Sequence, residues 1–431
     1  MKGFIFSEKG IGRKSSSDTQ VSVGQSTSNG NLGGALLDPL QKKTLESISG
    51  KFLLLLTIIL MCIGVLMVYS SGAGWGARKF QDSEYFLWRQ LIYVILGIGV
   101  IFFVGGIDYK LLKKYSKIIW MVSIALLALL LILKAGGVIT GAARWLGYGR
   151  FRFQASDLAK YALIIHLAML LSEKQSFIKD LEKSFQPMMI VIGITVVLVA
   201  LAPNFSTAAV LAAIGMMILF AGGVSVKHLT ITGLCALPPA ALFVLFGGYR
   251  KDRIDSFIGE ASYQNEQALI GLGNGGLFGL GIGASKQREL FLPASYNDFI
   301  FAVVGEEYGF LGAVALLLLF VGIVWCGFTI ARHALDDFGK YLAFGITVAL
   351  GMYAFVNAAV ACHLLPNTGL PMPFISYGGS AALFNALGVG LLISISREKK
   401  RRLNALPSPN VMNTEIGHLD PRIQKFSGEG A

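Results

Sequence analysis

Apolar residues occur in long blocks along this chain, separated by shorter polar stretches. Most blocks are about 18 to 22 residues long, the length that an α-helix needs to cross roughly 30 Å of hydrocarbon. The expected fold class is therefore an all-α integral membrane protein with about ten transmembrane helices. The predicted spans are residues 52–70, 88–107, 117–134, 157–172, 187–202, 206–224, 229–247, 300–331, 341–364 and 380–396.

The composition excludes a soluble globular protein of this size. Hydrophobic residues make up 54% of the chain and charged residues only 14%, and the mean hydropathy is +0.63. These charges are too few to cover the surface of one soluble core. Four cysteines lie inside apolar blocks without close pairing, which favours packing roles over metal sites or disulfides; they are Cys62, Cys235, Cys326 and Cys362.

Lys and Arg are unevenly distributed between the loops. An even number of spans places both termini on one side, and the loops of that side hold more basic residues than the opposite loops. The positive-inside rule therefore predicts cytoplasmic termini. Membrane topology also accounts for the net charge of +12, so no nucleic-acid partner is predicted.

Two polar ends flank the predicted membrane domain. Residues 1–50 are rich in Ser, Gly, Gln and Lys, without apolar periodicity, and are expected to form a disordered cytoplasmic tail. A cleavable signal peptide is not expected, because the first long apolar run starts only at Phe52. The predicted division is a tail at 1–50, a ten-helix domain at 51–397 and a cytoplasmic C-terminal tail at 398–431.

The longest polar interruption, residues 248–297, lies between the seventh and eighth predicted spans and faces outward in this topology. A loop of this length is usually functional. It contains the run GLGNGGLFGLGIGAS, whose glycines permit close backbone approach or re-entrant structure. A nucleotide-binding interpretation is weak, since no βαβ unit surrounds the run.

Four outward-facing clusters carry the candidate chemistry, because charges near a membrane are costly unless they are paired or face a polar cavity. They are Arg144 with Asp157 and Lys160; the stretch from Arg250 to Gln264; Asp298 with Glu306 and Glu307; and residues Ser376 to Ser380 after three prolines. Each has a structural alternative. In the same order, these are an acidic residue at a helix N-terminus with a lysine that snorkels to the membrane surface, a solvated loop, a helix cap at Asp298 and an interhelical turn.

Five segments, in order, resemble recurring blocks of the SEDS family of shape, elongation, division and sporulation proteins. They are GAARWL followed by FQASDLAK, PNFSTAAVL, NDFIFAVVGEEYGFLGA and LPNTGLPMPFISYGGS. The resemblance covers about residues 52–402. Division-type members are the more similar, given Gly305 before Glu306 and Glu307, the run YQNEQAL and the long polar N-terminal tail.

The resemblance implies a peptidoglycan glycosyltransferase that polymerises lipid II on the outer face of the bacterial inner membrane, at the division septum. Its implied partners are a class B penicillin-binding transpeptidase and other divisome membrane proteins. A carboxylate would deprotonate the hydroxyl of the acceptor sugar. Arg or Lys, with Mg²⁺ or Mn²⁺ as an optional helper, would stabilise the departing undecaprenyl pyrophosphate.

The family's catalytic aspartate is expected in an Asp-Pro stretch of the long loop, but that stretch is shortened here. Glu260 is therefore predicted as the catalytic base, with Asp255 as second choice. Three other positions also differ from the family pattern, with Ala155 in place of Pro, Asp157 in place of Glu and Asn204 in place of Asp. The predicted substrate-binding residues are Arg144, Asp157, Lys160, Arg250, Arg253, Gln264, Asp298, Glu306, Ser376, Gly378, Gly379 and Ser380.

Two other functions remain open. Many carriers also have about ten spans with acidic residues inside the membrane, so a lipid II flippase is an alternative. The two halves of the chain, however, show no convincing inverted repeat. The altered catalytic loop also allows a non-catalytic divisome scaffold.

Overall fold

The computed structural model describes residues 39–138, 144–148, 151–246, 248–259, 261–293 and 295–405. The chain divides into two units, Met1–Lys42 and Lys43–Ala431. Of the first unit only the last four residues are described, as the start of a helix. The predicted tails therefore lie largely outside the described residues. The following paragraphs concern the second unit.

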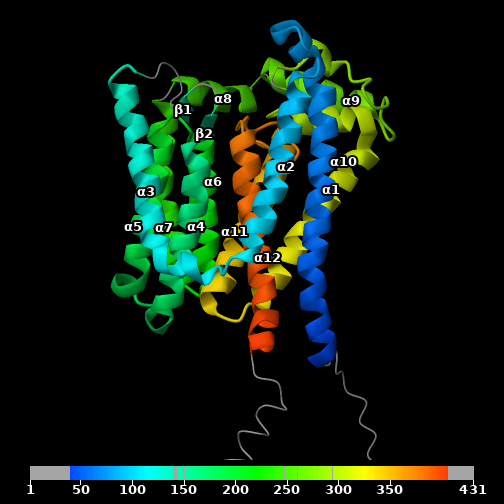
Figure 1. The fold of residues 1–431 in the computed structure, drawn as a ribbon. Helices are drawn as coiled ribbons and strands as arrows, with labels where there is room; N and C mark the ends of the chain where they lie inside the picture. The colour runs from blue at the N-terminus through cyan, green and yellow to red at the C-terminus, as the bar shows by residue number, and fades with distance from the viewer. Residues whose placement is uncertain are drawn as a thin grey trace, which may run out of the picture. The chain divides into compact units, whose positions relative to one another are not determined.

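Each of the ten predicted spans coincides with a long helix (Figure 1). The ten helices are α1 Pro39–Phe80, α2 Tyr85–Gly106, α3 Lys110–Ala135, α4 Ala155–Lys174, α5 Gln186–Leu201, α6 Phe205–Ala221, α7 Val226–Leu245, α10 Ile300–Arg332, α11 Asp337–Ala361 and α12 Gly379–Ala405. Within the described part of the chain, nine helical segments are long and apolar enough to cross a membrane, and α6 is apolar but shorter, with 17 residues. The chain is a multi-pass membrane protein, and the number ten stays a prediction.

The first and the last helix in the sequence, α1 and α12, extend beyond the predicted membrane domain. Helix α1 begins at Pro39, inside the segment predicted as a tail, and α12 continues to Ala405. The polar residues at these two ends add helical turns to each apolar span. The boundaries 51 and 397 therefore mark a change in composition rather than the end of a helix.

A small antiparallel hairpin is the exception to the all-helical prediction. Strands β1 Trp145–Tyr148 and β2 Phe151–Gln154 pair from Trp145 opposite Gln154 to Tyr148 opposite Phe151. Aromatic residues recur in both strands, and such residues favour extended backbone. Strand β2 leads directly into α4 at Ala155, so the hairpin determines where that helix begins.

The predicted long loop is partly helical. It contains α8 Gly248–Ile258, α9 Tyr263–Gly275 and the π-helical turn η3 Gln287–Phe291. Figure 1 places α8, α9 and the hairpin at one end of the bundle, opposite the end where α1 begins and α12 finishes. Two short turns, η1 Gln175–Phe177 and η2 Leu181–Phe185, connect α4 to α5.

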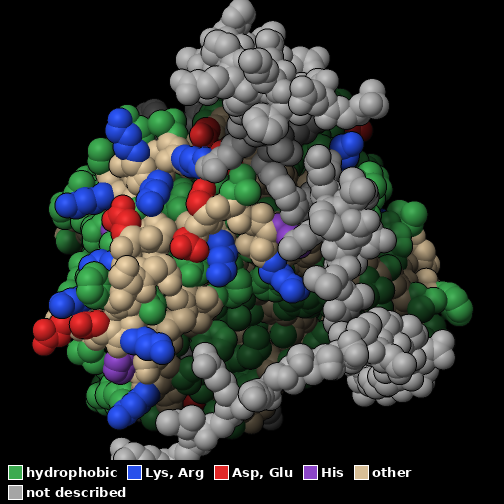
Figure 2. All heavy atoms as spheres, turned by 90° about the horizontal axis from the view of Figure 1, so that it is seen from below, with side chains coloured by type: hydrophobic (Ala, Val, Ile, Leu, Met, Phe, Trp, Pro, Cys, Tyr) green, Lys and Arg blue, Asp and Glu red, His purple; other side chains and the backbone are tan. Residues whose placement is uncertain are grey.

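Basic side chains gather at the end where α1 begins, which Figure 2 shows from below. The loops and helix ends there carry Lys110, Lys113, Lys114, Lys117, Lys174, Lys179, Lys183, Lys227, Arg332 and Lys340. One of them, Lys110, bonds Glu398 of α12 at 2.5 Å. The opposite end, with the hairpin, α8 and α9, carries the candidate site.

Helices α4 and α11 form the centre of the bundle. They are the most enclosed of the membrane-length helices, whereas α3 and α7 are among the most exposed. Helix α11 packs on both α4 and α10, and α12 packs on α2.

Candidate active site

A cavity of about 660 Å³ opens at the end of the bundle that carries the hairpin. It is lined by residues from α2, the hairpin, the segment before α10 and the segment before α12. Its polar and aromatic lining comprises Tyr85, Arg89, Tyr93, Arg144, Trp145, Gln154, Asn204, Tyr296, Asn297, Asp298, Tyr377 and Ser380. A concave site with convergent aromatic and hydrogen-bonding groups is typical of a ligand pocket.

Asp298 is the only carboxylate among the described residues that line this cavity. Its side chain is partly buried, and its Oδ1 atom has no hydrogen-bond partner among the described groups. Burial raises the pKa of Asp298, and the nearby positive charges of Arg253 and Arg144 partly oppose this effect. A cavity-facing carboxylate with a raised pKa suits proton abstraction.

The backbone on both sides of Asp298 is held by side chains from other elements. Asn357 of α11 is buried and donates from Nδ2 to the carbonyl oxygens of Asp298 (2.9 Å) and Leu370 (2.8 Å). Ser376 donates to the carbonyl oxygen of Asn297 at 2.6 Å. These bonds fix the segment that carries Asp298 against α11 and the proline-rich stretch.

Ser376 was predicted to bind substrate, but the structure occupies its hydroxyl otherwise. Besides donating to Asn297, its Oγ accepts a bond from the backbone N–H of Met372 at 2.8 Å. The next residue, Tyr377, bonds the carbonyl oxygen of Tyr296 through its own N–H at 2.9 Å. We therefore interpret Ser376 as a residue that positions the cavity wall.

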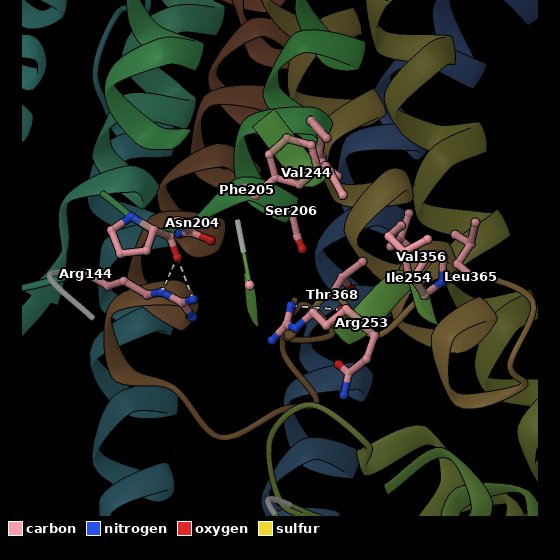
Figure 3. Close-up of a pocket in the computed structure, with 16 residues that line it drawn as sticks. Arg144, Asn204, Phe205, Ser206, Val244, Arg253, Ile254, Val356, Leu365 and Thr368 are labelled. Atoms are coloured by element: carbon pink, nitrogen blue, oxygen red, sulfur yellow. Dashed lines mark hydrogen bonds between the residues drawn. The ribbon is translucent and has the colours of Figure 1, made fainter. Parts of the chain in front are cut away.

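A second cavity of about 480 Å³ adjoins the first, and Arg144 and Asn204 line both. Figure 3 shows the guanidinium groups of Arg144 and Arg253 pointing into it from opposite sides. Arg144 donates to the carbonyl oxygen of Pro203 from Nε (3.1 Å) and Nη2 (2.7 Å), and Arg253 donates to that of Asn367 at 2.9 Å. The remaining walls are mostly apolar and include Phe205, Ala209, Val210, Val244, Ile254, Val356 and Leu365.

Asp157 and Lys160 lie below the first cavity rather than on its wall. Both side chains are buried, with 5% and 1% of their surface exposed. Asp157 accepts a bond from Ser380 at 2.9 Å, and Ser380 in turn accepts one from the backbone N–H of Gln154 at 3.1 Å. Because Ser380 lines the cavity, Asp157 is joined to the cavity wall through this hydrogen bond.

Lys160 is enclosed by aromatic rings and an amide. Its ammonium lies 4.2 Å from the ring centre of Tyr353 and donates to Asn385 at 3.2 Å. A buried cation is tolerated when such contacts replace water. Sequence reasoning placed Asp157 and Lys160 with Arg144 in one cluster, whereas the structure places Arg144 in the cavity and these two side chains in the core.

Glu306 and Glu307 lie near the start of α10 and line neither cavity. Glu306 is fully buried and accepts bonds from the Ser285 hydroxyl and from the backbone N–H groups of Lys286 (3.3 Å) and Gln287 (3.2 Å). Glu307 accepts a bond from the hydroxyl of Ser70 in α1. These contacts indicate that the two glutamates fasten the loop before α10.

Of the two predicted bases, only Asp255 lies among the described residues. Asp255 is exposed on α8 and lines neither cavity. Glu260 lies outside the described residues, as does the side chain of Arg250. Gln264 of α9 accepts a bond from Asn367 at 3.0 Å and so supports the wall near Arg253.

Gly378 and Gly379, which are predicted to bind substrate, line the first cavity. A Cβ atom at Gly379 would lie 2.3 Å from the ring of Tyr93. Only glycine therefore allows α12 to begin this close to α2.

Sequence reasoning missed Arg89 and the tyrosines around it. Arg89 lies within the first two turns of α2, lines the first cavity and stacks on the ring of Tyr85 at 4.3 Å. It is the only charged residue in α2, and this isolation inside an apolar block was the available signal.

The described residues offer little to a protein-bound metal ion. No group of three or more His, Cys, Asp and Glu side chains comes together among them. In the first cavity Asp298 would be the single carboxylate ligand, whereas Mg²⁺ and Mn²⁺ prefer several oxygen ligands. The nearby positive charge comes instead from arginines.

The sequence of residues 51–401 matches the FtsW/RodA/SpoVE family, described as cell cycle proteins. The chain belongs to this family. Among its relatives is a probable peptidoglycan glycosyltransferase FtsW of Geobacter sp. strain M18, 37% identical over 80% of this chain and 95% of the relative. The stage V sporulation protein E of Bacillus subtilis is 36% identical over 80% of this chain and 96% of that protein.

Solved structures confirm the fold of this family member. The rod shape determining protein RodA of Thermus thermophilus superposes with a TM-score of 0.59 at 26% identity, covering 80% of this chain and 96% of RodA. A chain of a peptidoglycan synthase complex gives a TM-score of 0.66 at 24% identity, covering 80% and 97%. The predicted helical membrane architecture and the resemblance to the SEDS family are thus confirmed.

Proposed function

We propose that this chain is a peptidoglycan glycosyltransferase that polymerises lipid II. Its relatives in Geobacter are named as probable peptidoglycan glycosyltransferases, and the substrate lipid II is our addition. The observation that carries the proposal is Asp298, a carboxylate with one unpaired oxygen that lines a cavity together with arginines and aromatic rings. This combination suits a reaction that removes a proton from a sugar hydroxyl and releases a phosphate group.

In the proposed reaction, Asp298 accepts the proton of the acceptor GlcNAc 4-hydroxyl. The resulting oxygen nucleophile attacks the anomeric carbon of the donor MurNAc, and a glycosidic bond forms. The bond from that carbon to the pyrophosphate breaks, and undecaprenyl pyrophosphate leaves with the electron pair. We assign the base to Asp298, with Glu260 and Asp255 as rivals, because Asp298 lines the cavity.

Arg144 and Arg253 would bind the pyrophosphate. Their guanidinium groups enter one cavity from opposite sides (Figure 3), and a pair of guanidinium groups can neutralise the charge that grows on the leaving group. The apolar remainder of that cavity would receive the first isoprene units. Arg89 and the tyrosines of the adjoining cavity would contact the sugars.

The proposed orientation places the site outside and the termini in the cytoplasm. The basic side chains at the end where α1 begins (Figure 2) support this orientation under the positive-inside rule. In this orientation the site faces the compartment in which peptidoglycan is assembled. Similarity to proteins named FtsW supports a location at the division septum.

We propose a class B penicillin-binding transpeptidase as the partner, along with other divisome membrane proteins. One structural neighbour comes from a study of how a peptidoglycan synthase complex coordinates polymerization and crosslinking. A partner that crosslinks the new strands would have to be near the exit of the cavity. The flippase and scaffold alternatives share the fold but do not require a reactive carboxylate at Asp298.

The test is glycan-chain formation from lipid II by the purified full-length protein, alone and with its transpeptidase. Wild type should form chains and Asp298→Asn should form none, while Asp255→Asn and Glu260→Gln retain activity. Loss in Glu260→Gln with retention in Asp298→Asn would move the base to Glu260. If wild type forms no chains under either condition, the glycosyltransferase proposal fails, and lipid II transport in liposomes would distinguish flippase from scaffold.

A further inference from the structure

Helix α10 is interrupted at Gly309. This residue has φ +69° and ψ −169°, values outside the helical range, while the residues on both sides are helical. An interruption leaves backbone N–H and C=O groups without their partners one turn away. Within a membrane-spanning helix such groups need other partners, since hydrocarbon offers none.

The segment Gly275–Gly283, here called the glycine turn, supplies those partners. The N–H of Phe310 donates to the carbonyl oxygen of Gly276 at 2.8 Å, and that of Leu311 donates to Leu277 at 3.2 Å. In the other direction, Leu280 donates to the carbonyl oxygen of Glu306, and Gly281 to that of Glu307, both at 3.0 Å. The glycine turn thus completes the backbone hydrogen bonding of the interrupted helix.

The side chains of the glycine turn point away from the protein. Leu277 is 62% exposed, Phe278 80% and Ile282 77%. On α10 beside them, Phe310 and Leu311 are also exposed. The sequence has no charged residue between Glu266 and Lys286. Two segments that are distant in the sequence therefore form one exposed apolar patch.

The length of α10 indicates where this patch lies relative to the bilayer. With its 33 residues, α10 is longer than a membrane requires, because about 20 helical residues cross roughly 30 Å of hydrocarbon. Its basic end at Arg332 belongs to the face with the clustered lysines. Counting about 20 residues back from Arg332 reaches the neighbourhood of Leu311, so the glycine turn lies at the opposite boundary of the hydrocarbon.

We propose that the glycine turn is a membrane anchor, which inserts Leu277, Phe278 and Ile282 among the phospholipid acyl chains of the leaflet on the side of the site. The absence of charge in the turn, its continuity with the exposed apolar residues of α10 and its backbone hydrogen bonds to α10 favour lipid as the occupant. This inference does not depend on the proposed reaction.

The anchor would also fix the height of the site above the membrane. Directly after the glycine turn, the chain is fastened to α10 through Ser285 and Gln287, which bond Glu306. It then continues through η3 to Asp298. The segment that carries Asp298 is thereby tied both to α10 and to the bilayer surface.

Spin-label accessibility tests the proposal. In a full-length variant whose four cysteines are replaced by serine or alanine, Phe278→Cys carries a nitroxide, and the protein is reconstituted in phosphatidylglycerol and phosphatidylethanolamine vesicles. Phe103→Cys, on an exposed position inside α2, serves as the lipid reference, and Asp82→Cys, exposed between α1 and α2, serves as the water reference. Collision with oxygen is compared with collision with a water-soluble nickel chelate.

The label at position 278 should give an oxygen-to-nickel ratio close to that at 103 and severalfold above that at 82. A ratio like that at 82 would overturn the proposal. A label inaccessible to both reagents would also overturn it, by indicating that protein covers the patch. Ile282→Cys provides a second reading if the first variant folds poorly, and it should give the same result.

Discussion

The carboxyl group of Asp298 depends on residues far from it in the sequence. Burial raises its pKa, and Arg253 and Arg144 partly reverse this rise. Asn357 and Ser376 fix the main chain on either side of it. A general base needs both a suitable pKa and a fixed position, so the neighbours of Asp298 should affect the rate in separable ways.

Replacing Asn357 by leucine should lower kcat by about 10- to 100-fold with little change in KM, because misplacing a reactive group by about 1 Å can cost that much. The substitution removes both bonds from Asn357, to Asp298 and Leu370, without changing volume greatly. Steady-state kinetics of lipid II polymerisation measures kcat and KM separately.

Thr347→Val is the matched control. It removes a buried hydroxyl from the same helix, where Thr347 bonds the carbonyl oxygen of Ala343. Equal losses in the two variants, or a change confined to KM, would contradict a positioning role for Asn357.

Replacing Arg253 by glutamine should shift the pH dependence of kcat/KM. The base must be ionised, so the rate rises as pH rises through the pKa of Asp298. Arg253 lowers that pKa, so its loss should raise the pKa and move the rising limb to higher pH. The pH profile of wild type and variant checks this direction, and Lys251→Gln, exposed on the same helix, should leave the limb in place.

At the scale of elements, the site depends on segments that approach each other closely. The stretch before α12 lies against the segment before α10, and the glycine turn inserts beside the interruption of α10. Close approaches of this kind require residues without side chains. Gly275 and Gly279 of the long loop meet this requirement against α10, where an added Cβ would overlap the carbonyl oxygens of Gly305 and Glu307.

Gly279→Ala should destabilise the protein. Gly279 has φ +83°, and an added Cβ would lie 2.1 Å from the carbonyl oxygen of Glu307. The left-handed conformation alone costs an L-residue about 1–2 kcal/mol, and the overlap adds to this. Thermal unfolding in detergent should occur at a lower temperature than for wild type.

Gly273→Ala is the comparison for that experiment. Gly273 is helical, and an added Cβ there meets nothing within 4 Å. Alanine is favoured over glycine inside a helix by about 0.8–1.0 kcal/mol, so this variant should be at least as stable as wild type. Unchanged stability in Gly279→Ala would contradict the close packing of the turn.

At the scale of the whole molecule, the two ends of the bundle differ in character. One end carries clustered lysines (Figure 2), and the other carries the hairpin, α8 and α9 (Figure 1). The two cavities are lined by residues of that second end. This polarity supports an orientation with the site outside.

Reporter fusions should confirm that orientation. Alkaline phosphatase, which is active only outside the cytoplasm, should be active when fused after Gly137, beyond the end of α3. Green fluorescent protein at the C-terminus should fluoresce. An inactive phosphatase at 137 with an active one at the C-terminus would reverse the topology.

Much of the fold could be predicted from the sequence because apolar blocks report membrane spans directly. The hairpin was missed because its four-residue strands are too short for a periodic signal. Of the predicted substrate-binding residues, six line the two cavities, and their binding roles stay predictions; they are Arg144, Arg253, Asp298, Gly378, Gly379 and Ser380. Arg89 was not predicted, because its partners across the cavity come from elements distant in the sequence.

The sequence by itself determined the membrane class, the family and the order of the spans, since each depends on local composition or contiguous motifs. Only the tertiary structure distinguished the roles of similar residues. It placed Asp298 at the cavity, Asp157 beneath it and Glu306 in the packing of the loop. Burial and partners, which set the chemistry of a carboxyl group, arise from contacts between helices that no local stretch of sequence specifies.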